Sequence, residues 1–491
     1  MFFNLFLIKG VEIFFVFRYL FSKFFREKVM KNMTEGNPLK LIILFMIPIL
    51  FGNIFQQIYI LSDLYILGHY LGLHALAVAG AMTPVFIMAM MTATGFTNGL
   101  SIITAQRFGA NDIKSVRKSF AIGILLSFLF AFIVIAFLVL KMDSILKLMN
   151  VPQDIYIDAG RFMTILSYGL VATIFYNFLS GILRALGDSK TPLYFLIFSS
   201  LLNIFINITL IVKFNLDVTG VAYGTCLAQV ISVVLCLFYM LVRFKILRVK
   251  IEDFKVSFVY LIEHLKLAFP MCVQFSIIGL GIIFIQSVCN QFGTDTIAAF
   301  SAATRIEQLT TMPLFSLGMA LTTYVAQNFG ARLIRRIRQG VLQCFLLSSG
   351  LSLILATIAF VWGRDLAGLF LNHPDEKVIS QSVMYIQTTT LFYFFLAQIF
   401  IFRQALQGMG RAVIPLVSAI IELIMRWFAA FVLAAILGYK GICYAGPIAW
   451  VFAALFVMVC YVITIKRFKV SLFGPLNQKS AIKRSFKIRL K

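Results

Sequence analysis

The chain has 491 residues, of which 61% are hydrophobic and only 13% are charged, and its mean hydropathy is +0.96. Soluble domains contain about 45–50% apolar and about 25% charged residues, so this composition excludes a water-covered chain and indicates a membrane protein. The net charge of +24 does not indicate nucleic-acid binding, because the basic residues cluster in short segments between apolar runs.

Residues 1–32 form an apolar segment that is interrupted by Lys9, Glu12, Arg18 and Lys23. Its longest uncharged stretch is too short to cross a bilayer, which takes about 20 apolar residues, and no small-residue cleavage site follows it. The segment fits either a basic interfacial helix or a start codon assigned too early, because Met33 offers a second start.

Twelve apolar runs follow, each about as long as a membrane-spanning helix. They cover residues 39–66, 76–104, 118–141, 157–180, 190–212, 218–242, 264–290, 296–327, 337–361, 378–402, 412–436 and 441–465. In lipid only helices and closed barrels satisfy their backbone hydrogen bonds, and these runs are too long for barrel strands. The sequence therefore predicts an all-α polytopic membrane protein with twelve transmembrane helices.

The second run ends in AQRFGA, residues 105–110, and nearly the same phrase recurs as AQNFGA, residues 326–331. Gln106 and Gln327 are 221 residues apart, and four further pairs recur in the same order at offsets of 221–223: Pro48 and Pro270, Pro152 and Pro374, Gly187 and Gly410, Gly220 and Gly441. The chain is thus a tandem duplication of a six-helix unit. Six is even, so both copies enter the membrane from the same side. This predicts two parallel six-helix lobes related by a pseudo-twofold along the membrane normal, a common transporter plan.

The loops between the predicted helices differ in charge, with 17 Lys and Arg in the even-numbered loops against 6 in the odd-numbered ones. This bias places the even loops and both termini in the cytoplasm. We expect an N-terminal extension at 1–32, an N-lobe with helices 1–6 at 33–242, and a basic cytoplasmic linker at 243–262. A C-lobe with helices 7–12 at 263–466 and a basic cytoplasmic tail at 467–491 complete the predicted organisation.

Motifs for catalysis, metal binding and nucleotide binding are missing from the sequence. The seven cysteines include no CxxC pair, and the sequence contains no HExxH, GxSxG, DxxD or P-loop motif. We therefore expect no enzymatic activity, no cofactor and no use of ATP as the energy source.

Four segments resemble the multidrug and toxic compound extrusion (MATE) family, particularly its bacterial branch: NPLKLIILFMIPILFGNIFQQIYILSDLYILGHYLG, AQRFGAND, GILRALGDSKTP and GMALTTYVAQNFGAR. The resemblance extends over about residues 33–470. It implies an antiporter of the bacterial cytoplasmic membrane that expels organic, often cationic, compounds in exchange for protons or sodium ions. Its partners would be small organic molecules and membrane lipids, with no nucleic acid, and we expect a monomer.

A flippase of lipid-linked saccharides, which has a related fold, is the alternative. Such a protein would show several cationic residues deep in its cavity to meet pyrophosphate. Inside the predicted helices the sequence places mainly Arg305 and Arg426, with acids beside them. This pattern favours the exporter.

Asp63 is the candidate cation-coupling residue of the N-lobe, because ionisable groups inside membrane helices are costly and mark pathways. Asn53, either Gln56 or Gln57, Ile60 and Asp63 share one helical face at spacings of three and four, which predicts a wall of a watery cavity in the N-lobe. The alternative places Asp63 at the outer headgroups. An acid matching Asp63 is a coupling residue in the resembled family.

Asn203 and Asn207, spaced i, i+4, and Asn177 are the predicted further cation ligands. In the family the second position of the couple is often Asp. This chain has the neutral Asn207 at that position, so it lacks the negative charge of the family's Asp. Whether H+ or Na+ binds at Asp63 is therefore left open.

Glu307 is the candidate substrate contact of the C-lobe, with Gln57, Met88 and Gln274 as further substrate-binding candidates. The alternative for Glu307 is a structural pairing with Arg305 or Arg426. For Met88 the alternative is ordinary helix packing, because Met and Phe are abundant throughout the chain. Glu422 and Arg426, spaced i, i+4, are predicted to form a structural ion pair.

Overall fold

The computed structural model describes residues 32–255, 257–369 and 375–473, with side chains described through residue 468. The first half contains α2 (Pro38–Ile66), α3 (Gly72–Gly109), α4 (Ile113–Leu140), α5 (Met142–Leu148), α6 (Tyr156–Ala185), α7 (Lys190–Val212) and α8 (Val218–Arg243). The second half contains α9 (Phe258–Cys289), α10 (Thr294–Gly330), α11 (Ile334–Val361), α12 (Gly363–Gly368), α13 (Glu376–Thr390), α14 (Tyr393–Gly408), α15 (Val413–Phe428), α16 (Ala434–Leu437), α17 (Tyr439–Cys443) and α18 (Ala445–Phe473). Short π or 3-10 turns are η1 (Leu67–Leu71), η2 (Lys245–Leu247), η3 (Ile251–Phe254), η4 (Asn290–Phe292) and η5 (Ala429–Leu433).

The described helices account for twelve membrane spans. Ten segments are long and apolar enough to cross a membrane, and one of them, Pro38–Gly109, has 72 residues. At a rise of about 1.5 Å per residue it is more than three times as long as the hydrocarbon layer, so α2 and α3 must cross separately. α13 and α14 form one further span, bent by 52°.

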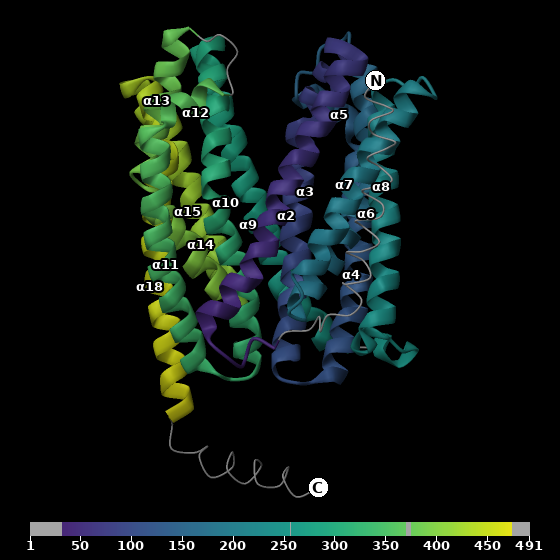
Figure 1. Ribbon diagram of the computed structural model, residues 1–491, viewed down its shortest axis with the longest axis vertical. Helices are drawn as coiled ribbons and strands as arrows, with labels where there is room; N and C mark the ends of the chain where they lie inside the picture. Colours follow the sequence, from purple (N-terminus) through teal and green to yellow (C-terminus); the bar gives the residue numbers. More distant parts are fainter. Residues whose placement is uncertain (1–31, 256, 370–374, 474–491) are drawn as a thin grey trace, which may run out of the picture.

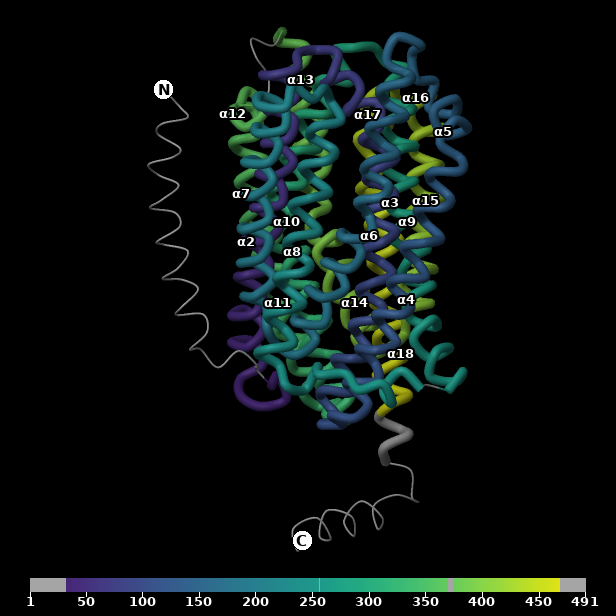
Figure 2. Tube along the Cα trace, turned by 90° about the vertical axis from the view of Figure 1, so that its right-hand side faces the viewer, coloured from purple at the N-terminus to yellow at the C-terminus, as the bar shows by residue number. Residues whose placement is uncertain are grey.

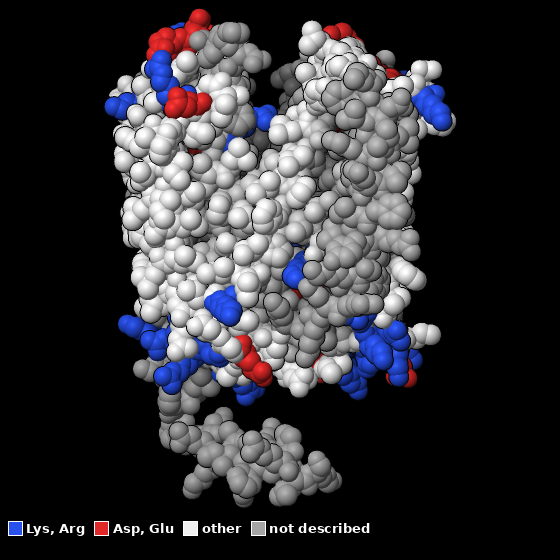
Figure 3. Space-filling model, in the orientation of Figure 1, with Lys and Arg blue, Asp and Glu red and all other residues white. Residues whose placement is uncertain are grey.

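The spans are arranged as two lobes, as the duplication predicts. Figure 1 shows α3–α8 on one side and α10–α18 on the other, with their axes close to the long axis of the molecule. In the view of Figure 2, α18 projects beyond the bundle at the lower end. Figure 3 shows Lys and Arg side chains gathered at this end, which we call the basic end, and a cleft between the lobes at the opposite end.

Helix α2 divides its contacts between the two lobes. Near the basic end, Ile42, Phe45 and Ile49 are buried in the C-lobe core, which includes Leu317 of α10. Farther along, α2 packs against α7 of the N-lobe, and Figure 1 shows its oblique course from one lobe to the other. Pro48 lies inside the helix and removes one backbone hydrogen bond, which allows a bend at this level.

Helix α9, which corresponds to α2 in the second repeat, also contacts both lobes, but in the opposite order. Ala268 and Cys272 are buried in the N-lobe core, whereas Val288 and Cys289 lie in the C-lobe core. The first half of α2 is therefore packed in the C-lobe, and the first half of α9 is packed in the N-lobe. The ranges 33–242 and 263–466 remain predicted chain boundaries, but the packing of the two lobes is interleaved.

The repeated AQxFGA phrases meet at the basic end, where they hold the lobes together. Gln106 Nε2 on α3 donates to the carbonyl oxygen of Gly408 at the end of α14, 2.9 Å away. Gln327 Nε2 on α10 donates to the carbonyl oxygen of Ala185 at the end of α6, also over 2.9 Å. Each glutamine thus satisfies a free carbonyl at a helix end of the opposite lobe.

The glycine of each phrase allows this close approach. A Cβ on Gly109 would lie 1.9 Å from the carbonyl oxygen of Gln327, and a Cβ on Gly330 would lie 1.8 Å from that of Gln106. No side chain fits at such distances. We call this contact of α3 with α10 the basic-end seal.

The linker and the tail differ in part from their predicted ranges. α9 begins at Phe258, about five residues before the predicted start of the C-lobe, and the two 3-10 turns η2 and η3 lie in the linker before it. α18 continues to Phe473, into the predicted tail. The N-terminal extension through residue 31 and the tail beyond residue 473 lie outside the described residues.

The predicted orientation can be tested by thiol labelling from outside the cell. Leu73 is 85% exposed at the start of α3, far from the basic end, and Leu333 is 37% exposed at the basic end between α10 and α11. If the basic end is cytoplasmic, Leu73→Cys should react with an impermeant thiol reagent in intact cells and Leu333→Cys should not. Both should react in permeabilised cells, and the reverse pattern in intact cells would invert the assignment.

Candidate functional site

The N-lobe contains a polar cluster around Asp63, which lies in the second half of α2. Asn207 Nδ2 on α7 donates to Asp63 Oδ1 at 2.8 Å and to Asn203 Oδ1 at 3.2 Å. Asn203 Nδ2 in turn donates to Thr225 Oγ1 on α8 at 3.2 Å. The structure thus brings together three of the four predicted coupling residues, Asp63, Asn203 and Asn207.

Two buried side-chain oxygens at this cluster lack a hydrogen-bond partner in the described part of the chain. Within the described residues, the buried side-chain oxygen of Asn207 and the buried hydroxyl of Tyr59 have no hydrogen-bond partner. Asn207 must turn its NH₂ group toward Asp63, because two acceptor oxygens would repel each other. Its oxygen is then left without a donor, and buried acceptors of this kind are costly unless a proton or cation meets them. The donor set of carboxylate, amide and hydroxyl oxygens suits a hard cation or a proton.

Asn177 is not part of this cluster. Its Nδ2 lies 3.4 Å from Thr94 Oγ1 of α3, a contact that joins α6 to α3. Asn53 also departs from the predicted N-lobe wall, because its Nδ2 donates to Ser316 Oγ of the C-lobe helix α10 at 3.0 Å. The crossing course of α2 explains the difference, since one face of this helix meets different lobes along its length. Gln57 is half-buried on α2 between these two sites.

Glu307, the C-lobe candidate, is held by a tyrosine. Tyr385 of α13 donates its hydroxyl to Glu307 Oε2 at 2.9 Å. Arg426 lies near enough for electrostatic attraction, but neither it nor Arg305 forms an ion pair with Glu307 among the described residues. The Glu307 side chain is half-buried. It therefore keeps acceptor capacity for a cationic group.

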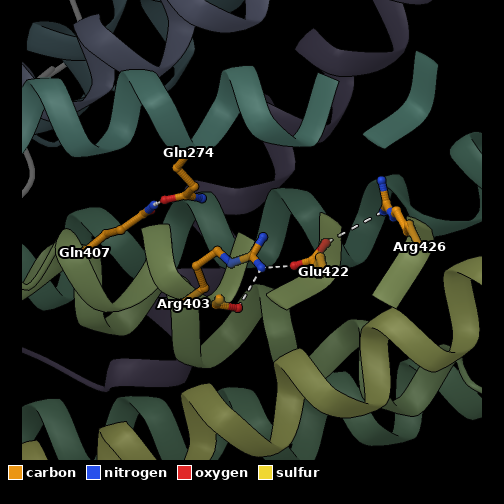
Figure 4. A network of polar contacts seen from close by, with 6 residues as sticks. Gln274, Arg403, Gln407, Glu422 and Arg426 are labelled. Carbon is orange, nitrogen blue, oxygen red and sulfur yellow. Dashed lines mark hydrogen bonds and ion pairs between the residues drawn. The ribbon is translucent and has the colours of Figure 1, made fainter. Parts of the chain in front are cut away.

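A buried ion network lies within the C-lobe (Figure 4). Glu422 on α15 pairs with Arg403, which also donates to Ser418 Oγ at 2.9 Å. The predicted contact of Glu422 with Arg426 is also present, at 3.7 Å. Arg403 directly follows the predicted run 378–402 and is counted among the basic residues of the next loop. That prediction is wrong, because this side chain is 5% exposed within α14. Burial of Glu422 requires a close counter-charge, and Arg403 provides it.

The two remaining substrate candidates lie in different environments. Gln274 of α9 is 1% exposed and accepts a hydrogen bond from Gln407 Nε2 at 2.9 Å, as Figure 4 shows. Met88 of α3 lies against α9, where a Cβ on Gly279 would be 3.4 Å from its sulfur atom. Met88 therefore packs at the contact between α3 and α9.

A cavity lies between the lobes, directly beside the basic-end seal, and its empty space is about 520 Å³ when the part open to solvent is included. It is lined by α3, α6, α9, α10 and α14, with apolar groups such as Phe275 and Phe315 and polar groups such as Asn98 and Gln404. Among the described residues, the only charged one in its lining is Arg184.

A protein-family model described as MatE matches residues 48–209 and 270–432. The two matches fall one in each lobe, with each covering helices related by the duplication. The chain belongs to the MatE family. As a MatE protein with twelve described spans, it is a multi-pass membrane transporter rather than an enzyme.

Several MatE relatives are similar over most of their length. The probable multidrug resistance protein YpnP of Bacillus subtilis (strain 168) is 29% identical over 418 residues, which cover 84% of this chain and 92% of the relative. The multidrug export protein MepA of Staphylococcus aureus (strain MRSA252) is 22% identical over 431 residues, covering 87% and 94%.

Solved structures share the MatE fold. A structure described as MATE in the bent conformation matches with a TM-score of 0.84 and 23% identity, covering 90% of this chain and 99% of that one. An outward-facing multidrug resistance MATE family transporter of the MOP superfamily matches with a TM-score of 0.81 and 23% identity, covering 90% and 100%. These matches confirm the predicted two-lobe architecture.

Sequence reasoning missed several groups at these MatE sites. Tyr59 precedes Asp63 by four residues and shares its helical face, so helical spacing alone could have indicated it. Thr225, Tyr385 and Arg184 gave no such signal, because each reaches its site through the packing of separate helices.

Proposed function

We propose that this MatE protein exports organic compounds, with cationic ones favoured, in antiport with H+ or Na+ across the bacterial cytoplasmic membrane. The relative YpnP is named a probable multidrug resistance protein, and MepA is named a multidrug export protein. The observation that carries the proposal is the combination of a seal at the basic end with a cleft at the other end (Figure 3). Two lobes closed on one side only are suited to alternating access, and a basic cytoplasmic end makes this arrangement outward-facing.

Asp63 is the proposed coupling carboxylate. Desolvation disfavours a bare carboxylate inside a helix bundle, so Asp63 would either take up a proton or be held ionised by a sodium ion. Asn207 and Asn203 supply neutral groups beside it, which leaves Asp63 as the only charge among the described residues of the cluster. Inward movement of one positive charge releases about 2.3 kcal/mol per 100 mV, enough to support outward transport of a drug.

The proposal is tested by dye efflux in everted membrane vesicles that contain the wild-type protein. A pH gradient and a sodium gradient are imposed separately, and accumulation of a cationic dye is followed by fluorescence. We expect accumulation with one of the two gradients and none with ATP alone in the presence of an uncoupler. Absence of accumulation with either gradient would contradict antiport.

Glu307 is the proposed contact for the positive charge of a substrate in the C-lobe. Glu307→Gln keeps the size of the side chain and removes its charge, so it should reduce resistance to cationic compounds by about tenfold or more. Resistance to neutral compounds should change little. The measurement is the minimum inhibitory concentration of matched cationic and neutral drugs in cells with equal expression of both proteins.

Tyr385→Phe is the control for this experiment, because it removes the donor to Glu307 and leaves the carboxylate in place. It should retain the preference for cations. Equal loss of resistance to both drug classes in Glu307→Gln would show that Glu307 is structural.

A further inference from the structure

One positively charged side chain lines the described part of the cavity between the lobes. Arg184 lies in the last turn of α6, and the other lining residues are neutral. Thr322 of α10 and Gln404 of α14 border the same space from the opposite lobe, together with the apolar side chains of Met271 and Phe275 of α9. The cavity is therefore an apolar and amide-lined space with one positive charge.

Arg184 has no acidic partner within the described part of the chain. The nearest carboxylate in the sequence, Asp188, forms no ion pair with Arg184 among the described residues and bonds elsewhere. Asp188 accepts hydrogen bonds from the backbone N–H groups of Lys190 at 3.1 Å and Thr191 at 3.0 Å, and from the Thr191 hydroxyl. These bonds use the Asp188 carboxylate to cap the first turn of α7.

The position of Arg184 explains how a single cation is tolerated there. The C-terminal end of a helix carries partial negative charge, which favours a basic residue in the last turn. That partial charge makes a full ion pair unnecessary and leaves the hydrogen-bond donors of the guanidinium available to the cavity. The repeat-related position in the C-lobe holds Gln407, 223 residues later, so the positive charge belongs to one lobe only.

We propose that Arg184 is an anion-binding subsite, which takes the carboxylate of a drug-sized amphipathic acid in the cavity between the lobes. The inference rests on the proposed export function and extends its substrates from cations to organic acids. The planar guanidinium matches a carboxylate with two parallel hydrogen bonds. The apolar body of the ligand would lie against Met271 and Phe275.

The subsite is separate from the proposed cation contact at Glu307. Glu307 precedes Thr322, which borders the cavity, by 15 residues on α10. At about 1.5 Å per residue this is roughly 22 Å along the helix, more than a drug-sized molecule spans. An organic acid of that size held at Arg184 therefore does not reach Glu307 at the same time.

The test uses two xanthene dyes that share one cationic ring system and differ in one group, an ethyl ester in the first and a free carboxylic acid in the second. Binding to the purified full-length protein in detergent is measured by fluorescence polarisation. Arg184→Gln, which introduces the residue of the matching C-lobe position, should weaken binding of the acid dye by about tenfold to hundredfold. Binding of the ester dye should stay within about twofold, and Arg184→Lys should retain most binding of the acid dye.

A lipid phosphate is the other anion that the guanidinium of Arg184 could bind, and nanodiscs distinguish it from an organic acid. Binding of the acid dye is measured again in nanodiscs with and without phosphatidylglycerol. An Arg184-dependent loss of acid-dye binding on addition of this lipid would overturn the assignment to an organic acid. Equal affinity of wild type and Arg184→Gln for the acid dye would overturn the subsite itself.

Gradient-driven accumulation of the ester dye by wild-type vesicles, measured in parallel, reports on export alone. Failure of that accumulation would count against the export function. An unchanged affinity of Arg184→Gln for the acid dye would count only against the anion subsite.

Discussion

Asp63→Asn is expected to insert and fold normally but to lose gradient-driven efflux down to the level of vesicles without the protein. The substitution keeps the size of the side chain and a hydrogen bond with Asn207, which is 2.8 Å away in the wild type. A neutral amide cannot gain or lose charge when a proton or sodium ion binds. Coupling requires that the ion and the drug favour different lobe arrangements, and without a charge change at Asp63 that difference disappears.

Asn207→Ala is the matched comparison. It removes the donor to Asp63 and to Asn203 but leaves the carboxylate, so we expect a partial loss of efflux of about tenfold or less. Both variants are compared with the wild type at equal membrane expression and with equal elution from size-exclusion chromatography. Wild-type efflux by Asp63→Asn under the same gradient would show that the coupling ion binds elsewhere, with Glu307 as the next candidate.

Gly109→Ala is expected to reduce efflux by at least about tenfold through the basic-end seal. A Cβ at this position would lie 1.9 Å from the carbonyl oxygen of Gln327. The obstacle is a backbone atom of the opposite lobe, which cannot rotate away. The seal would therefore separate, the outward-facing arrangement would lose stability, and the transport cycle would slow. The measurement is the initial rate of dye efflux at equal expression.

The same helix provides the control for this variant. Gly80, also in α3, has no atom within 4 Å of an added Cβ, so Gly80→Ala should transport within about twofold of the wild type. The double variant Gln106→Ala, Gln327→Ala removes both hydrogen bonds across the seal without adding bulk, and we expect it to slow transport as well. Normal efflux in Gly109→Ala would mean that the seal is not required for the cycle.

The architecture could be predicted from the sequence because it depends on properties that are read along the chain. The lengths of the apolar runs indicate the number of membrane spans. Paired landmarks such as Gln106 and Gln327 lie 221–223 residues apart, and this constant offset indicates two related lobes. The couple of Asn203 and Asn207 beside Asp63 was also predictable in part, since residues spaced i, i+4 share a helical face. The resemblance to the family supplied the role of Asp63.

The partners across helices could be known only from the tertiary structure. The oblique course of α2 sends Asn53 to Ser316 of one lobe and Asp63 to Asn207 of the other, although both lie on one helical face. Packing likewise brings Tyr385 to Glu307, which are 78 residues apart.

Packing also decided which charges are buried and which face open space. It placed Arg403, expected in a loop, against Glu422 inside the C-lobe, and it left Arg184 as the only charge among the described residues that line the cavity between the lobes. The physical reason is that a helical pattern fixes which face of one helix is polar. Which neighbour meets that face depends on how twelve helices share a limited space.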